Sequence, residues 1–155
     1  LTPAPPAGVI ALRPSNLRAF ARIQMTWAWW RRPHRAKLGE ALSHTFNTTD
    51  PGEGAGQHAG FVHDSGRALF EMGLPWLDPA RATMIDPRLV TVPLLFVAAR
   101  EDKLTPPDVV RRAARRFGHA ADYVEYPDQG HWVLGQPGWQ RIAEDAVAWL
   151  DGKAA

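Results

Sequence analysis

The feature that most constrains the fold of this chain is an apolar run over residues 92–99. The run carries no polar side chain, and its length is that of a strand buried on both faces, as in a parallel sheet. Asp102 comes just past its end, where ligands and catalytic groups gather in open α/β sheets. The run therefore predicts an α/β fold with functional residues at the carboxyl end of this strand.

The residues after this run predict a helix and then a second strand. Thr105 and the two prolines after it are typical of a capping hydroxyl followed by proline in the first helical turn, and Gly118 is typical of a helix end. Residues 122–126 have the pattern of the next strand, and His131 follows in a glycine-containing turn. Because Asp102 and His131 both follow strands of one parallel sheet, we expect them at the same sheet edge, as two members of a nucleophile–histidine–acid triad.

This stretch resembles the C-terminal part of an α/β-hydrolase. In that family an apolar strand is followed by the acid of the catalytic triad, here Asp102, and then by a proline, here Pro106. The histidine of the triad comes in a Gly-His-aromatic turn, here residues 130–132, and the order of acid before histidine also matches. The resemblance implies that Asp102 and His131 are catalytic. Trp132, beside the histidine, is the first candidate for substrate contact.

Residues 9–89 contain no predicted strand and have the pattern of a helical insertion. Apolar spacing, caps and breakers predict helices there over about residues 15–32, 36–43, 55–62 and 65–72, and a last helix is expected over residues 139–150. An insertion of this kind between two sheet strands resembles the cap, or lid, of the α/β-hydrolases, so it should overhang His131. The chain is then a partial α/β-hydrolase fold, with parallel sheet strands and an inserted helical cap. Its parts are the end of a core strand (1–8), the helical cap (9–89) and the C-terminal part of the core (90–155).

The nucleophile of the triad has no strong candidate in this sequence. The serines are Ser15, Ser43 and Ser65, and none stands in the Gly-x-Ser-x-Gly turn that must follow a strand and open a helix. Ser65 comes nearest and is interpreted as a helix cap, with a role in the site as the alternative. The absence of cysteine excludes a cysteine nucleophile and disulfides. In the α/β-hydrolase family the nucleophile precedes the cap, so the resemblance implies that it lies upstream of Leu1, together with the oxyanion donors.

Tryptophans supply the candidates for an apolar substrate pocket. Trp27, Trp29, Trp30 and Trp76 are expected mainly to form the core of the cap, and some of them to line the pocket, since such pockets are largely apolar. Trp27 and Trp30 lie on the apolar stripe of the first predicted helix. They are therefore the candidates for substrate contact from the cap.

The rest of the composition excludes several classes of function. The net charge is only +2 and the basic clusters are small, so the expected partner is a small-molecule substrate and not nucleic acid. No apolar run approaches the length of a membrane span and no secretory leader is visible, so a cytoplasmic protein is expected, with a leader before Leu1 left open. His58, His63 and Asp64 lack the spacing of a metal site, so we expect neither a metal nor a cofactor. The sequence does not predict the oligomeric state.

The resemblance implies a serine hydrolase of the esterase type that acts on small to medium apolar esters, amides or lactones. A hydrolase fold with an aspartate nucleophile, as in dehalogenases and epoxide hydrolases, is one alternative, because the half of the fold present here looks much the same in both classes of enzyme. A non-catalytic binding module is another, although a pure binder has no need of the acid and the histidine. Without a nucleophile and without flanking strands, residues 1–155 alone are expected to be inactive and poorly soluble.

Overall fold

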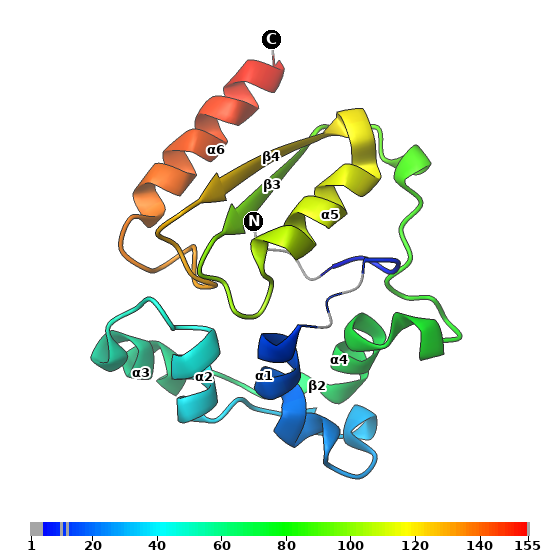
Figure 1. The fold of residues 1–155 in the computed structure, drawn as a ribbon, viewed down its shortest axis with the longest axis vertical. Helices are drawn as coiled ribbons and strands as arrows, with labels where there is room; N and C mark the ends of the chain where they lie inside the picture. Colours follow the sequence, from blue (N-terminus) through cyan, green and yellow to red (C-terminus); the bar gives the residue numbers. More distant parts are fainter. Residues whose placement is uncertain (1–4, 10, 12, 155) are drawn as a thin grey trace.

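A computed structural model describes residues 5–9, 11 and 13–154, which form two groups of elements (Figure 1). One group is a parallel pair of strands covered by helices, and the other consists of the short helices α1 to α4. Residues 7 and 8 form a turn, and residues 1–4 lie outside the described residues. The end of a core strand over residues 1–8 therefore stays a prediction.

The parallel sheet predicted from the apolar run is present. β3 (Leu94–Ala99) pairs in parallel with β4 (Ala121–Tyr126), and Ala99 lies opposite Tyr126. The Arg100 N–H donates to the Tyr126 carbonyl at 2.9 Å, so the pairing continues to the point at which both strands end. Figure 1 shows both arrowheads pointing toward α1 to α4. The carboxyl ends of the two strands therefore meet at one edge, next to the helical group.

Two helices cover the sheet, α5 (Pro107–Phe117) and α6 (Trp139–Ala154). Side chains of β3 alternate between them, as the period of two in a strand requires. Phe96 and Ala98 pack in a layer with α5, whereas Val97 and Ala99 pack in a second layer that includes Ile142 of α6. The apolar run is continuous because β3 is buried on both faces.

The helical group is made of short α-helices: α1 (Pro14–Gln24), α2 (Leu38–His44), α3 (Pro51–Ala59) and α4 (Gly66–Gly73). A two-residue antiparallel pair, β1 (Pro33–His34) with β2 (Asp64–Ser65), joins the segment after α1 to the start of α4. The prediction of no strand in residues 9–89 is wrong at this place. Extended residues that flank helices can pair when tertiary packing brings them together, and so short a pair leaves no alternating pattern in the sequence.

The first helix ends well before residue 32, because local hydrogen bonds that the apolar spacing does not show set its end. The Thr26 hydroxyl donates to the Arg22 carbonyl at 3.0 Å and competes with the helical bond to that carbonyl. Ala28 then has a φ of 53°, a left-handed conformation that does not continue a helix. The chain continues in the 3-10 helix η1 (Trp29–Arg31). Trp27 is therefore outside any helix and its side chain is 84% exposed.

The caps that begin the helices agree with the sequence in part. Ser65 accepts a hydrogen bond from a backbone N–H of α4 at 3.3 Å, so its predicted role as a cap is confirmed. α3 begins earlier than predicted because the Asp50 carboxylate caps it, accepting bonds at 2.8 and 3.1 Å. Thr105 does not cap α5: Pro106 occupies the cap position and no side chain bonds the helix end there. The prediction for Thr105 is thus wrong, because its backbone is bound to a neighbouring acid.

An ion pair joins α1 to α2. Arg22 Nε and Nη2 donate to the two Glu40 carboxylate oxygens at 2.6 and 2.8 Å. These bonds are the main reason that the pKa of Glu40 is lowered to about 2, and the Lys37 backbone N–H adds a bond at 2.8 Å. Because the pKa is lower in the folded state, the carboxylate stabilises the fold above its unfolded-state pKa. This contribution is lost as the pH falls toward the folded-state pKa.

Glu40→Gln is expected to lower the free energy of unfolding at neutral pH by up to about 1 kcal/mol, the usual size for a partly exposed ion pair. The difference from the wild type should shrink as the pH falls from about 5 toward 2, because the wild-type carboxylate then takes up a proton as well. Urea unfolding followed by circular dichroism at several pH values measures this. Glu144→Gln, at an exposed position of α6, is the control. A difference that stays constant with pH would contradict the role of the ion pair.

Candidate active site

The loop after β3 fixes the Asp102 side chain, which is 0% exposed. Its Oδ1 accepts hydrogen bonds from the backbone N–H groups of Leu104 and Thr105, both at 2.7 Å. The Asp102 N–H itself donates to the Ala99 carbonyl at 3.2 Å, which turns the chain sharply at the end of the strand. These bonds hold the carboxylate plane in one orientation and leave Oδ2 for another partner.

His131 is that partner. Its Nδ1 lies 2.9 Å from Asp102 Oδ2, and its side chain keeps 26% of its surface exposed. An ionised carboxylate can only accept a hydrogen bond, so Nδ1 carries the proton and the lone pair of the neutral ring lies at Nε2. Among the described residues, nothing forms a hydrogen bond with Nε2. The order of strands predicts this relative position, and the ring is oriented to accept a proton at Nε2.

Two buried glutamines hold the loop that carries His131, and the sequence interpretation missed both. Gln136 Nε2 donates to Gln129 Oε1, and Gln129 Nε2 donates to the Pro137 carbonyl at 3.1 Å. Gln136 Oε1 accepts a hydrogen bond from the Gly130 N–H at 3.3 Å. The backbone directly before the histidine is therefore tied to the far side of its own loop through side-chain amides.

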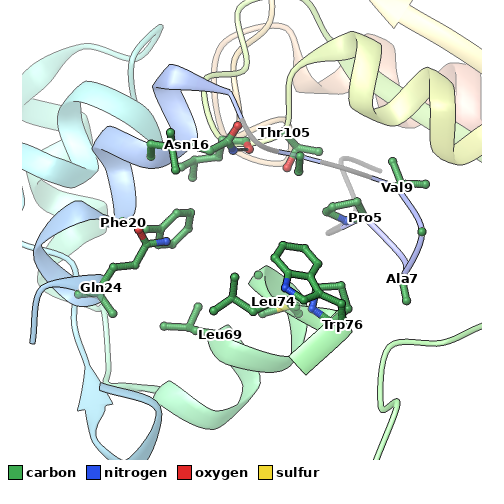
Figure 2. A pocket seen from close by; sticks show the side chains of 18 of the residues that line it. Pro5, Ala7, Val9, Asn16, Phe20, Gln24, Leu69, Leu74, Trp76 and Thr105 are labelled. Carbon is green, nitrogen blue, oxygen red and sulfur yellow. Dashed lines mark hydrogen bonds between the residues drawn. The ribbon is translucent and has the colours of Figure 1, made fainter. Parts of the chain in front are cut away.

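His131 opens onto a cavity of about 620 Å³. Its wall is mostly apolar and comes from α1, from α4 and the residues after it, and from the segment that precedes α1. Figure 2 shows Phe20, Leu74 and Trp76 around the same hollow, with Thr105 at the end nearest the acid loop. The helical group thus lies over the exposed side of the histidine, and a ligand in the cavity would be surrounded by apolar side chains.

The tryptophans that the sequence predicts as substrate contacts do not line this cavity. Trp27 is exposed because α1 ends before it. Trp30 packs on Phe70, with ring centres 6.1 Å apart. Trp132 packs edge-on against Phe46, with ring centres 5.5 Å apart. Adjacency to the histidine therefore does not bring Trp132 to the cavity wall, since its ring turns toward the loop after α2.

Trp29 and Trp76 are the tryptophans that line the cavity among the described residues. Trp29 is 8% exposed and belongs to the aromatic run that the sequence shows plainly. A helix continued through residue 32 puts Trp27 and Trp30 on its inner face. Once the helix is broken after Gln24, the 100° turn per residue no longer applies and Trp29 faces inward.

No serine lines the cavity in the described part of the chain. Ser65 caps α4, and the Ser43 hydroxyl donates to the Gly39 carbonyl at 2.7 Å within α2. The described cavity wall also has no cysteine, aspartate or glutamate, and Thr105 is its one hydroxyl-bearing residue. A nucleophile must lie within hydrogen-bond reach of its base. The described residues thus provide a base and its orienting acid without a serine next to them.

The described residues contain no group of three histidine, aspartate or glutamate side chains that could hold a metal ion. His58, one of the histidines considered for such a site, instead has its Nε2 at 2.8 Å from the Ala36 carbonyl. Within the same residues, no helix is long and apolar enough to cross a membrane.

Residues 76–150 match a family model described as TAP-like protein. The match includes β3, α5, β4 and the loop that carries His131, so it contains both members of the Asp102–His131 pair. No solved structure matches the chain.

Proposed function

We propose that this chain, whose residues 76–150 match the TAP-like family model of the α/β-hydrolase superfamily, supplies the acid and the histidine of a serine hydrolase of the esterase type. The observation that carries the proposal is the 2.9 Å contact between His131 Nδ1 and Asp102 Oδ2, beside an apolar cavity. The nucleophile and the oxyanion donors come, in this proposal, from protein outside residues 1–155.

Each residue of the pair has a distinct role. His131 Nε2 takes the proton from the attacking serine hydroxyl and later gives it to the leaving group. Asp102 keeps the proton of the neutral ring on Nδ1 and stabilises the imidazolium that forms during the reaction. The two backbone N–H bonds to Asp102 Oδ1 keep the other oxygen aimed at the ring, so no rearrangement is needed when the charge develops.

The cavity favours an apolar substrate of small to medium size. Its volume of about 620 Å³ lies in the usual range for sites that hold small organic molecules. Phe20, Ile23 and Leu69 contribute apolar surface, and the described wall has no carboxylate that could pair with a cationic substrate. An ester, amide or lactone with an apolar acyl group fits this lining. Residues 9–89 act in this proposal as the cap that covers the reacting bond.

A hydrolase with an aspartate nucleophile is the second candidate, because the same apolar cavity suits a haloalkane or an epoxide. In that reaction His131 would activate the water that releases the covalent intermediate. A fluorophosphonate probe distinguishes the two, since it labels an activated serine and leaves an aspartate unmodified. A non-catalytic binding module would neither react with the probe nor turn over any of these substrates.

Residues 1–155 alone are expected to hydrolyse short-chain aryl esters no faster than buffer, whereas the full-length protein is expected to turn them over. The isolated chain has the base without a nucleophile or preorganised oxyanion donors, so no tetrahedral intermediate is stabilised. It is also expected to self-associate, because among the described strands β3 pairs only with β4 and its second edge stays open. Release of nitrophenol and size-exclusion chromatography measure the two properties.

One result would contradict the need for a nucleophile from outside this chain. It is a soluble monomer of residues 1–155 whose esterase activity disappears in the His131→Ala variant. If that activity also disappeared in Ser65→Ala and remained in Ser43→Ala, Ser65 would be the nucleophile, despite its role as the cap of α4.

A further inference from the structure

We propose that Thr48, in the loop between α2 and α3, is a positioning residue that holds the histidine loop in its reactive geometry. The inference rests on the hydrolase function proposed above. Thr48 is not part of the cavity wall, so it acts through the residues it binds and not on a substrate. It belongs to the helical group, whereas the loop that it contacts belongs to the sheet group.

The hydrogen bonds of Thr48 lead directly to the residue before the histidine. Its Oγ1 donates to Gln136 Oε1 at 2.6 Å. Gln136 Oε1 also accepts a hydrogen bond from the Gly130 N–H at 3.3 Å. Gln136 is buried, and its Nε2 is held by Gln129. The Gln136 amide therefore cannot turn away without losing bonds on both of its ends, and Thr48 fixes the end that binds Gly130.

The packing around Gly130 shows how close this contact is. A Cβ atom at that position would lie 2.4 Å from Thr48 Oγ1 and 3.1 Å from Asn47 Oδ1. Only a residue without a side chain lets the Thr48 hydroxyl come so near to the backbone. The loop between α2 and α3 thus rests directly on the peptide that precedes His131, and a shift of one moves the other.

The neighbouring residue reaches the other catalytic loop. Asn47 Nδ2 donates to the Glu101 carbonyl at 2.9 Å, in the peptide that joins Glu101 to Asp102. Residues 47 and 48 therefore bind the acid loop and the histidine loop at once. They fix the distance between the two loops, and the 2.9 Å contact between Asp102 and His131 depends on that distance.

The test is an isosteric exchange of the hydroxyl for a methyl group in the full-length protein. Thr48→Val is expected to lower kcat on an aryl ester by about 10-fold to 100-fold, the order that a small misplacement of a catalytic group costs, with KM within about twofold. Thr48→Ser keeps the hydroxyl and should restore kcat. Thr48 is itself exposed, so the exchange disturbs no core.

Thr49→Val is the matched control at the next position. The Thr49 Oγ1 is buried and has no hydrogen-bond partner among the described residues, so its loss should change neither kcat nor KM. An equal loss of kcat in Thr49→Val, or a loss in Thr48→Val that only follows the folded fraction measured by circular dichroism, would overturn the proposal. Such a result would assign the loop a purely structural role.

A second readout does not depend on turnover. The proton on His131 Nδ1, in its bond to Asp102, should give a downfield NMR resonance that shifts and exchanges faster with water in Thr48→Val, and returns in Thr48→Ser. If the resonance changes in the two variants as described and the wild type hydrolyses no ester, the positioning role holds and the proposed hydrolase function fails. An unchanged resonance together with an unchanged kcat would overturn the positioning role and leave the hydrolase function intact.

Discussion

Replacement of His131 by alanine in the full-length protein is expected to abolish ester hydrolysis. The ring is the one group of the described cavity wall that is placed to accept a proton, because its Nδ1 is bound to Asp102 and its Nε2 has no partner among those residues. Without it the attacking hydroxyl keeps its proton, and removal of a triad member leaves only a small residual rate. Steady-state kinetics on an aryl ester measure the effect, and circular dichroism checks that the variant is folded.

Asp102→Asn is expected to lower kcat by about 10⁴-fold, because the variant selects the wrong tautomer of the histidine. Oδ1 faces the N–H groups of Leu104 and Thr105, so the amide of asparagine must keep its oxygen there and turn its NH₂ group toward His131. Nδ1 must then accept a hydrogen bond, and the ring proton moves to Nε2, where the lone pair is needed.

Asp128→Asn is the matched control for this exchange. Asp128 lies in the same loop as His131 but is exposed and pairs with Arg141 at 3.0 Å. Its loss should change kcat by no more than about twofold, since exposed ion pairs contribute little. If Asp102→Asn kept most of the wild-type turnover, the carboxylate would not control the tautomer, and the catalytic role of the pair would have to be abandoned.

Gly66→Ala is expected to produce the largest loss of stability in the helical group. A Cβ atom at this position would lie 2.2 Å from the Trp29 carbonyl oxygen and 2.3 Å from the Arg32 carbonyl oxygen. Both neighbours are backbone atoms of the segment that includes η1, so neither can rotate out of the way. Overpacking of this kind costs about 1–3 kcal/mol or more. Urea unfolding of the full-length protein measures the loss.

Gly56→Ala is the control, and here the stability is expected to increase. Gly56 lies inside α3, and a Cβ atom built there meets nothing within 4 Å. Because alanine favours a helix over glycine by about 0.8–1.0 kcal/mol, this variant should be more stable than the wild type. If Gly66→Ala unfolded at the same urea concentration as Gly56→Ala, the close contact between α4 and the segment after α1 would be wrong.

The sheet and the acid–histidine pair are the features that the sequence predicts best. An eight-residue apolar run, followed by an acid, a proline-led helix and a second strand, leaves few alternatives to a parallel pair. In a parallel pair both carboxyl ends meet at one edge, so the positions of Asp102 and His131 follow from strand order alone. Their hydrogen bond depends in addition on the contacts that hold the two loops, such as the backbone N–H bonds to Asp102 Oδ1.

The helical group is harder to predict because tertiary contacts and single side-chain bonds decide its local structure. The end of α1 depends on the Thr26 hydroxyl and on the left-handed conformation of Ala28, neither of which has a sequence pattern. Because the predicted helix was too long, the sequence places Trp27 and Trp30 at the cavity, whereas Trp29 lines it in the structure. Gln129 and Gln136 were missed for a related reason. Glutamine side chains are usually exposed, and nothing in the sequence indicates that these two are buried and bind each other.

The groups that hold the peptide directly before His131 are amides, a hydroxyl and backbone carbonyls, and none of them gains or loses a proton between about pH 4 and 9. Added salt does not screen such uncharged contacts as it screens ion pairs. In a hydrolase built on this loop, changes of turnover with pH therefore report the reacting groups themselves, because the bonds that hold the peptide before His131 stay the same over this range.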